Sequence, residues 1–380
     1  MSGSAVVPWG ATLGVEEEFL TVDPGTGMPV PAAAAVLGGV PAGAAAAELK
    51  PELLACQVEA ATGVCRTLGD VRGQVTQARA ALAASAHTQG VAVMSVGFAP
   101  VMADGPLPLT PGERYLAIER LYRGVVDDYA ACGLHVHVGV ADRETAVAVV
   151  NHLRPWLATL QVLTGNSAFC RGRDTGFASW RTVVQSRFPG FGAPPWCADA
   201  AAYDRAMGRQ AAFGTTVDPQ MTFWSARPSE HAPTVEVRAA DAVPTADEAV
   251  LHAALVRALV VRARMDLDAG RQAAPVDDAV IAAAMWSAAR HGLRGPAVDP
   301  ARERQMPAAV MVHALLAHVR DALDEFGDRD EVHRLVSHIL ERGTGAERQR
   351  AAAASGGIAA VCELAGLPQS TCADPLPEAS

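Results

Sequence analysis

The sequence predicts an α+β fold built as one large domain. Residues 12–22, 133–140 and 234–241 alternate apolar and polar side chains with the period of two that is typical of half-buried strands. From residue 277 onward the apolar spacing is helical. No internal repeat or low-complexity linker divides the chain, so we expect one domain over residues 12–365, with an N-terminal tail before it and a flexible C-terminal tail at 366–380.

The composition excludes several classes of function. Of the 380 residues 50% are hydrophobic, yet no run of eighteen apolar residues is uninterrupted, so we predict no membrane span and no membrane partner. A formal net charge of −10 argues against nucleic acid as a partner. Seven scattered cysteines without C-x-x-C spacing, and the lack of an evident signal peptide, predict a cytoplasmic protein with free thiols.

The cations of the chain are almost all arginine. Lys50 is the single lysine among 31 lysine and arginine residues, and there is no G-x-x-x-x-G-K-[ST] loop. If the protein binds phosphate groups, we expect it to use arginine, backbone amides or a metal. Lys50 is the one lysine that could act as a phosphate clamp or form a Schiff base.

The first strand contains three consecutive glutamates. The period of two places Glu16 and Glu18 on one face and Glu17 on the other, beside Val15 and Phe19. Two carboxylates about 7 Å apart on one face repel each other unless a cation lies between them or water solvates them. The strand therefore predicts either a cation site or a solvated acidic face.

The following segment, residues 48–62, places Glu52 and Glu59 seven positions apart. If the segment is helical, both lie on one side, and a solvated helix face is the alternative to a site. A loop-like region precedes it, and a short buried strand is expected at 91–96. A helix is expected at 70–88, with Asp70 as its N-cap. Capping boxes predict two more helices, at 110–131 and from Thr245 to about 265. Helices are also expected at 142–165, with a break near Pro155, and over most of 277–364.

The two later strands carry further polar pairs. His135 and His137 share one face of the second strand, where they suit metal ligation or phosphate contact, and hydrogen-bonded core histidines are the alternative. Glu236 and Arg238 share one face of the third strand, where a structural ion pair is the alternative to a site.

A long loop-like stretch, residues 166–196, combines arginines with aromatic residues. Trp180, Arg181 and Arg187 are among them. Long loops in compact domains are often functional, and guanidinium groups beside aromatic rings suit the phosphates and base of a nucleotide. A packed surface loop is the alternative interpretation.

Together these elements supply a ligand set for a hard metal ion. Mg²⁺ or Mn²⁺ prefers carboxylate oxygens, sometimes with one imidazole. Several carboxylates facing one cavity would repel each other without such cations. With arginines nearby, the set suits metal-dependent phosphoryl transfer from a nucleotide. The candidate ligands are Glu16, Glu18, Glu52, Glu59, His135 and Glu236.

Six motifs follow one another along the chain: GVEEEFL, ELLACQVEAATGVC, GLHVHVGV, the DTGFASWR…SRFP loop, TVEVRAAD and WSAARHG. In this order they resemble the bacterial carboxylate–amine ligase branch of the glutamate–cysteine ligase superfamily, over about residues 12–365. The resemblance implies a glutamine synthetase-like fold, with a curved, mainly antiparallel sheet that forms the active-site cavity and carries helices on its outer face. It also implies ATP-dependent amide formation through an acyl phosphate, two or three Mg²⁺ ions and a homodimer.

The resemblance also implies roles for individual residues. The six carboxylate and histidine ligands named above would hold the metals, and Glu18 and Arg238 would be catalytic. His137, Trp180, Arg181 and Arg187 would contact the nucleotide. Glutamate is the first expectation for the carboxylate substrate, with an amine as the second substrate. A metal-dependent phosphotransferase and a non-catalytic nucleotide-binding relative are the alternatives.

Overall fold

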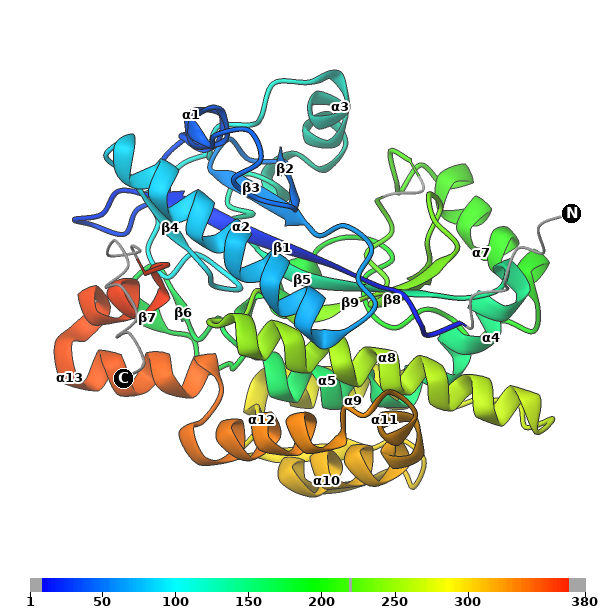
Figure 1. Cartoon of the computed structure of the whole chain (residues 1–380). Coiled ribbons are helices and arrows are strands. Elements are labelled where there is room, and N and C mark those ends of the chain that lie inside the picture. Colours follow the sequence, from blue (N-terminus) through cyan, green and yellow to red (C-terminus); the bar gives the residue numbers. More distant parts are fainter. Residues whose placement is uncertain (1–8, 219–220, 369–380) are drawn as a thin grey trace, which may run out of the picture.

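Within residues 9–218 and 221–368, which the computed structural model describes, an antiparallel sheet of seven strands forms the centre of the fold (Figure 1). The strand order is β2-β3-β1-β5-β9-β8, and β4 pairs with the end of β1. This confirms the α+β class and the mainly antiparallel sheet. The strands are β1 (Leu13–Val22), β2 (Glu48–Pro51), β3 (Gln57–Ala61), β4 (Ala92–Met94), β5 (Gly133–Gly139), β8 (Ala226–Pro228) and β9 (Thr234–Asp241).

The alternation within β1 gives the sheet two different faces. Val15 and Phe19 are buried on the face that packs against helices. Glu17 points to the same face, where Nε of Arg79 donates to its carboxylate at 3.0 Å. Glu16 and Glu18 project from the opposite face and line a cavity. The strands predicted at 12–22, 91–96, 133–140 and 234–241 are confirmed.

Helices cover the apolar face of the sheet, and α8 lies along it with buried residues over nearly its whole length (Figure 1). Its N-cap is Thr245, whose Oγ1 accepts a hydrogen bond from the amide of Glu248, as the capping box predicts. The break near Pro155 is also confirmed, because a 3₁₀ turn at Arg154–Trp156 separates two helices. The covering helices are α2 (Leu68–Thr88), α4 (Arg143–Leu153), α5 (Leu157–Thr164) and α8 (Ala246–Asp268).

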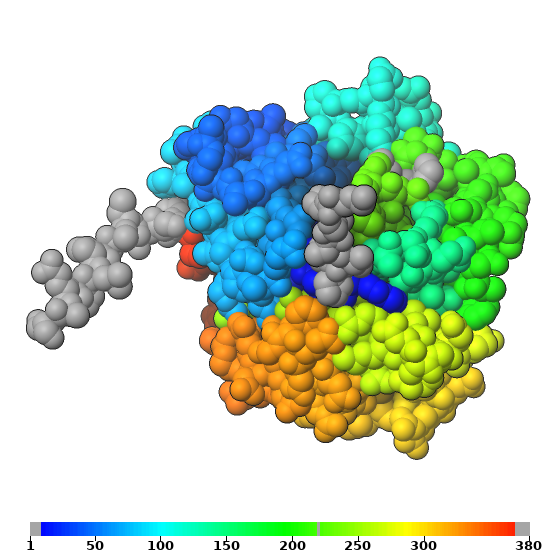
Figure 2. All heavy atoms as spheres, turned by 45° about the vertical axis from the view of Figure 1, so that its right-hand side comes forward, coloured from blue at the N-terminus to red at the C-terminus, as the bar shows by residue number. Residues whose placement is uncertain are grey.

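Helices from the C-terminal part of the chain form a further layer beneath α5 and α8, visible in yellow and orange in Figures 1 and 2. This layer and the sheet share one apolar core. Its elements are α9 (Asp278–His291), α10 (Ala308–His318), α11 (Arg320–Phe326), α12 (Arg329–Arg342) and the hairpin β10 (Pro296–Asp299) with β11 (Arg304–Pro307).

The remaining elements lie around the rim of the sheet. Among them, α13 is interrupted by non-helical backbone at Gly356 and Gly357. They are α1 (Ala33–Gly39), α3 (Glu113–Tyr122), the 3₁₀ turn Arg123–Val125, β6 (Phe169–Cys170), β7 (Arg173–Asp174), α6 (Trp180–Gln185), α7 (Ala200–Ala212) and α13 (Gly345–Ala365).

Several local predictions are wrong. The helix considered as one interpretation of residues 48–62 does not form, and the segment contains the hairpin β2–β3, because β3 pairs with β1 on one side and with β2 on the other. A short helix, α1, lies in the region expected to be a loop, and the predominantly helical C-terminal region contains the hairpin β10–β11.

Three helix starts or ends also differ from the prediction. The N-cap of α2 is Thr67, and Asp70 occupies the third helical position of the capping box. The helix α3 is shorter than expected, ends at Tyr122 and starts after Gly112 without a side-chain cap, so the capping box expected at Thr110 does not form.

The predicted tails lie mostly outside the described residues. Leu367, close to the end of the described chain, donates its amide hydrogen to the carbonyl of Val93. Across residues 9–218 and 221–368, none of the helices combines the length and apolar character needed to cross a membrane.

Candidate active site

Cross-strand register brings residues from distant parts of the sequence together on the open face of the sheet. Lys50, Glu59 and Glu18 lie directly opposite one another on β2, β3 and β1. Side chains in such a row share one face and are direct neighbours. Glu18 is further bound by the amide of Gly133 on β5, which donates to its Oε2 at 2.6 Å. Glu52, in the turn between β2 and β3, completes this end of the site.

One group of possible metal ligands lies here, and we call it the carboxylate cluster: Glu18, Glu52 and Glu59. One oxygen from each of the three lies within 4.8 Å of the others. The cation closest to it is Lys50, whose ammonium forms an ion pair with Glu59 at 2.9 Å. When all three carboxyl groups are ionised, the one ammonium leaves an excess of negative charge, and such a set of oxygens suits Mg²⁺.

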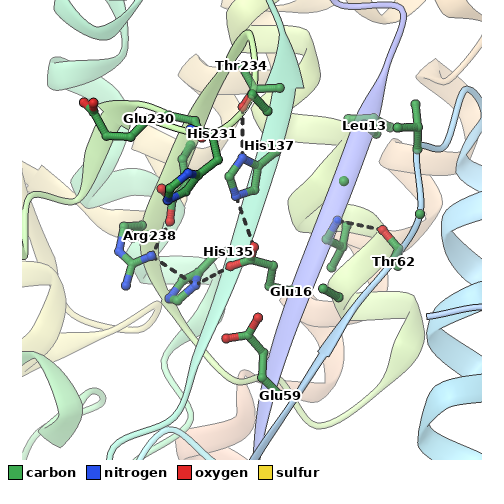
Figure 3. A pocket seen from close by; sticks show the side chains of 18 of the residues that line it. Leu13, Glu16, Glu59, Thr62, His135, His137, Glu230, His231, Thr234 and Arg238 are labelled. Atoms are coloured by element: carbon green, nitrogen blue, oxygen red, sulfur yellow. Dashed lines mark hydrogen bonds and ion pairs between the residues drawn. The ribbon is translucent and has the colours of Figure 1, made fainter. Parts of the chain in front are cut away.

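A second group, which we call the histidine cluster, consists of Glu16, His137 and Glu236, again with ligand atoms within 4.8 Å of one another. His137 lies opposite Glu236 across β5 and β9, and its Nε2 is 3.4 Å from Oε1 of Glu16. Its Nδ1 contacts Oγ1 of Thr234 at 2.9 Å, which fixes the ring (Figure 3). An imidazole and two carboxylates also form a plausible set for a divalent ion.

Arginines already neutralise part of the histidine cluster. Nε of Arg227, on β8, donates to Oε2 of Glu236 at 2.6 Å, and Nη1 of Arg238 donates to Oε1 of the same carboxylate. The Glu236 side chain is almost fully buried between them. Charge-assisted pairs of this kind hold a carboxylate in a fixed orientation.

His135 lies between the two clusters. Its Nδ1 is 3.2 Å from Oε2 of Glu16 and 3.3 Å from Nη1 of Arg238, and its Nε2 is 3.8 Å from Oε1 of Glu18 (Figure 3). The residue is 2% exposed. Of the two histidines, His137 lies in the histidine cluster and His135 lies between the two clusters. The expectation that His135 is a metal ligand and His137 a nucleotide contact stays a prediction.

The two clusters have opposite electrostatics. In the carboxylate cluster, burial and repulsion between neighbouring carboxylates raise the pKa of Glu18 to about 7 and the pKa of Glu59 to about 8. In the histidine cluster, burial also raises the pKa values of Glu16 and Glu236, but hydrogen bonds and nearby positive charges lower them by more. Hydrogen bonds with His135 and His137 hold the pKa of Glu16 well below its usual range, and the charges of Arg238 and Arg227 do the same for Glu236.

The histidines respond to the same surroundings. Burial and the nearby Arg238 lower the pKa of His135 to about 4, so its ring is neutral at pH 7. Burial also opposes the charge on His137, but its contact with Glu16 and the charge of Glu236 raise its pKa. Nδ1 of a neutral His135 makes one of its two contacts as a hydrogen bond at a time: when protonated it donates to Glu16, and when unprotonated it accepts from Nη1 of Arg238.

Both clusters open into one cavity of about 470 Å³. Figure 3 shows Glu16, Glu59, His135, His137 and Arg238 directed into it from the sheet. The cavity is large enough for part of a nucleotide or a small substrate. Its wall also contains side chains that the sequence did not single out, namely Arg114, Arg227, Ser229, Glu230, His231 and Thr234. Arg227 lies on a strand of three residues, too short to show alternation, which is why pattern analysis missed it.

The remaining predicted residues lie outside the cavity wall formed by the described residues. Arg181 is buried behind it, where Nη2 donates to the carbonyl of Arg238 at 3.4 Å. Trp180 packs against Phe177, with ring centroids 5.7 Å apart. Arg187 forms an ion pair with Asp128 at 2.6 Å. The structure therefore brings together the predicted metal ligands, His137 and Arg238, but not the three loop residues.

Two carboxylate-rich ligand groups on the open face of an antiparallel sheet, with arginines beside them, suit an enzyme of metal-dependent phosphoryl transfer. The model of glutamate–cysteine ligase family 2 matches residues 12–364. The chain belongs to this family, and its activity is that of an ATP-dependent carboxylate–amine ligase. It is 53% identical over 351 residues to the "Putative glutamate–cysteine ligase 2-2" of Saccharopolyspora erythraea. The aligned residues cover 92% of this chain and 90% of that protein.

Solved structures share the fold at low sequence identity. Glutamate–cysteine ligase from Francisella tularensis, determined in complex with AMP, superimposes with a TM-score of 0.70 and 13% identity over 93% of this chain and 87% of that chain. A bifunctional glutathione synthetase from Pasteurella multocida gives a TM-score of 0.66 and 12% identity, with 93% of this chain and 51% of that chain covered. These similarities confirm the predicted fold.

Proposed function

We propose that the protein uses ATP and Mg²⁺ to activate a carboxylate, with glutamate as the first candidate, and joins it to an amine. The observation that carries this proposal is the pair of ligand groups in one cavity. Divalent cations held there would neutralise the phosphate charges and orient the γ-phosphoryl group. Glu16, His137 and Glu236 would hold one ion, and Glu18, Glu52 and Glu59 another.

The residues fit such ions for a physical reason. The carboxylate cluster contains three largely buried carboxylates with one ammonium beside them, an arrangement that a bound divalent cation would stabilise. In the histidine cluster the imidazole of His137 is held by Thr234, as histidine ligands commonly are by a second hydrogen bond.

The chemistry proceeds in two steps. A carboxylate oxygen of the substrate attacks the γ-phosphorus, the bond to the β-phosphate oxygen breaks, and ADP leaves. The amine then attacks the acyl carbon, a proton is lost from the nitrogen, and inorganic phosphate leaves with the electron pair of the C–O bond. Arg238 lies at the cavity wall where it can stabilise charge on the transferred group, and His135 fixes its orientation.

The test is ADP release from ATP and Mg²⁺ against amino acids supplied singly and in pairs, with mass detection of products. ADP that appears only with a carboxylate and an amine together, with an amide product, supports the proposal and names both substrates. ADP with one substrate alone and a stable phosphorylated product would instead indicate a phosphotransferase. Binding of ATP without turnover of any pair would indicate a non-catalytic relative. Glu59→Gln serves as the inactive control.

Three further statements belong to the same proposal. The chain forms one catalytic domain over residues 12–365, the protein assembles as a homodimer, and it works in the cytoplasm. The family resemblance supports the first two, and the free cysteines among the described residues are consistent with the third. Sedimentation equilibrium tests the dimer directly.

A further inference from the structure

The single lysine of the chain lies at the carboxylate cluster. Lys50 faces Glu59 across the β2–β3 pair, and its ammonium is 2.9 Å from Oε1 of that carboxylate. Glu59 is in turn opposite Glu18 in the same row. The lysine therefore occupies one side of the group of oxygens that we have assigned to a divalent cation.

Lys50 differs from the arginines of the cavity in how firmly it is held. Arg227 and Arg238 are largely buried and bind Glu236 through several donors. The side chain of Lys50 is 43% exposed and projects from β2, which is the edge strand of the sheet. An ammonium is a compact point charge on a flexible stem, so it can leave one anion for another at little conformational cost.

The charges of the cluster favour such an exchange. When the three carboxyl groups are ionised, one ammonium offsets one of them, and the arginines around the cluster are engaged elsewhere. Arg238 binds Glu236, Arg114 binds Asp218 at 2.8 Å, and Arg181, whose charge also acts on Glu18, lies 4.0 Å from the carboxylate of Asp241. A divalent ion supplies two charges at a position that all three carboxylates can reach. Once bound, it would repel the ammonium from Glu59.

We propose that Lys50 is a built-in counter-ion of the carboxylate cluster, that a divalent cation displaces it, and that the released ammonium then binds an oxyanion of a reactant in the cavity. The inference rests on the proposed function, because it requires a cation at Glu18, Glu52 and Glu59. The oxyanion is either a phosphate of the nucleotide or the carboxylate of the substrate. Lys50 lines the cavity, which is where either reactant would bind.

The single lysine allows a direct test. Protein that contains ε-¹³C-lysine has one labelled side chain, so one signal reports on Lys50 in the full chain. Mg²⁺ binding is followed by calorimetry on the same sample. We expect the lysine signal to shift in proportion to bound Mg²⁺. In Glu59→Gln, the signal should start near the Mg²⁺-bound position and move little when Mg²⁺ is added.

The outcomes separate this inference from the proposed function. Mg²⁺ binding without a shift of the lysine signal overturns the exchange and leaves the metal site intact. No Mg²⁺ binding at all overturns both. With Mg²⁺ saturating, a further shift on addition of a non-hydrolysable ATP analogue assigns the oxyanion to the phosphates, and a shift on addition of glutamate assigns it to the carboxylate. No shift with either overturns the second half of the proposal.

Substitution of Lys50 gives a second test, in which the affinity for Mg²⁺ and the affinity for the reactant should change in opposite directions. Lys50→Met removes the competing charge, so Mg²⁺ should bind about threefold to tenfold more tightly, while KM for the reactant that the ammonium binds should rise about tenfold. A purely structural lysine would not tighten Mg²⁺ binding when removed. The matched control is Arg114→Met, which removes an exposed cation of the same cavity whose partner, Asp218, is not a proposed ligand. It should leave Mg²⁺ affinity unchanged.

Discussion

The two ligand groups of this cavity lie on the same sheet, yet the protein treats them differently. The histidine cluster is stabilised by the protein's own cations, because Arg227 and Arg238 bind Glu236 and two imidazoles contact Glu16. The carboxylate cluster has only Lys50 as a direct ion-pair partner among the described residues. One group is thus pre-organised before any ligand arrives, and the other depends on a cation from solution for its charge balance.

The largest expected effect follows from removing that external cation. Treatment with EDTA should reduce ATP turnover by at least ~10³-fold, because several kcal/mol of charge stabilisation is lost. Excess Mg²⁺ should restore the rate. The measurement is ADP release before chelation, after it and after Mg²⁺ is returned. Full activity after exhaustive chelation would contradict the assignment of both clusters.

Single substitutions should separate the clusters by their effect on stability. Glu236→Gln takes the carboxylate away from two largely buried guanidinium groups, and we expect it to cost about 3 kcal/mol in the free energy of unfolding. Glu59→Gln relieves repulsion between carboxylates, so its stability should be equal to or greater than that of the native protein. Both variants should lose turnover.

Urea unfolding in EDTA measures this difference without interference from bound metal. A native-like m-value in both variants would show that the fold is unchanged. Equal destabilisation by the two substitutions would refute the proposed difference between a histidine cluster stabilised by the protein's own cations and a carboxylate cluster that depends on added cations.

The dependence on pH should also differ. A carboxyl group whose pKa is higher in the folded than in the unfolded protein destabilises the fold as pH rises between the two values. Glu18 and Glu59, with pKa values of about 7 and about 8, should therefore weaken the metal-free protein between about pH 5 and pH 8, starting from the ordinary glutamate pKa near 4.3. The lowered pKa values of Glu16 and Glu236 act only under more acidic conditions.

Because Mg²⁺ requires ionised carboxylates, its stabilising effect should grow over the same range. The rise in Tm on adding Mg²⁺ should be at least about 2 °C larger at about pH 8.5 than at about pH 6. Thermal unfolding with Mg²⁺ and with EDTA at both pH values provides the measurement. In Glu59→Gln this pH dependence should be smaller, and an identical Mg²⁺ effect at both pH values would count against the raised pKa values.

The sequence predicts the strands of the sheet, and which side chains share a face of a strand, better than it predicts the ligand clusters. Alternation is a local property, so β1, β5 and β9 and the common face of Glu16 and Glu18 follow directly from the residues. The hairpin β2–β3 did not follow, since the spacing of Glu52 and Glu59 also fits a helix. Its strand character comes from pairing with β1, which local spacing does not contain.

The division of the ligands between two clusters is a property of register. His135 and His137 share a face, and only the pairing of β5 with β1 and β9 determines that His137 meets Glu236 while His135 lies opposite Glu16. Lys50 likewise gains its role from lying opposite Glu59. Arg227 shows the same limit, because its partner Glu236 is on a neighbouring strand. Which residues of neighbouring strands lie opposite each other depends on the pairing of the whole sheet, which the sequence of a single strand does not specify.

The smallest expected effect on the site tests the alternation of β1 itself. Glu17 lies between two proposed ligands in the sequence but points to the opposite face, where it binds Arg79. Glu17→Gln should destabilise the protein by about 3 kcal/mol, because it leaves the buried Arg79 without its carboxylate, and should leave Mg²⁺ affinity within about twofold of the native value.

Glu18→Gln, one residue further, should instead weaken Mg²⁺ binding at the carboxylate cluster by at least about tenfold. Calorimetric Mg²⁺ titration of the two variants, with urea unfolding as the second measurement, distinguishes the faces. A loss of Mg²⁺ affinity in Glu17→Gln as large as in Glu18→Gln would mean that the strand does not separate structural from ligand-binding carboxylates.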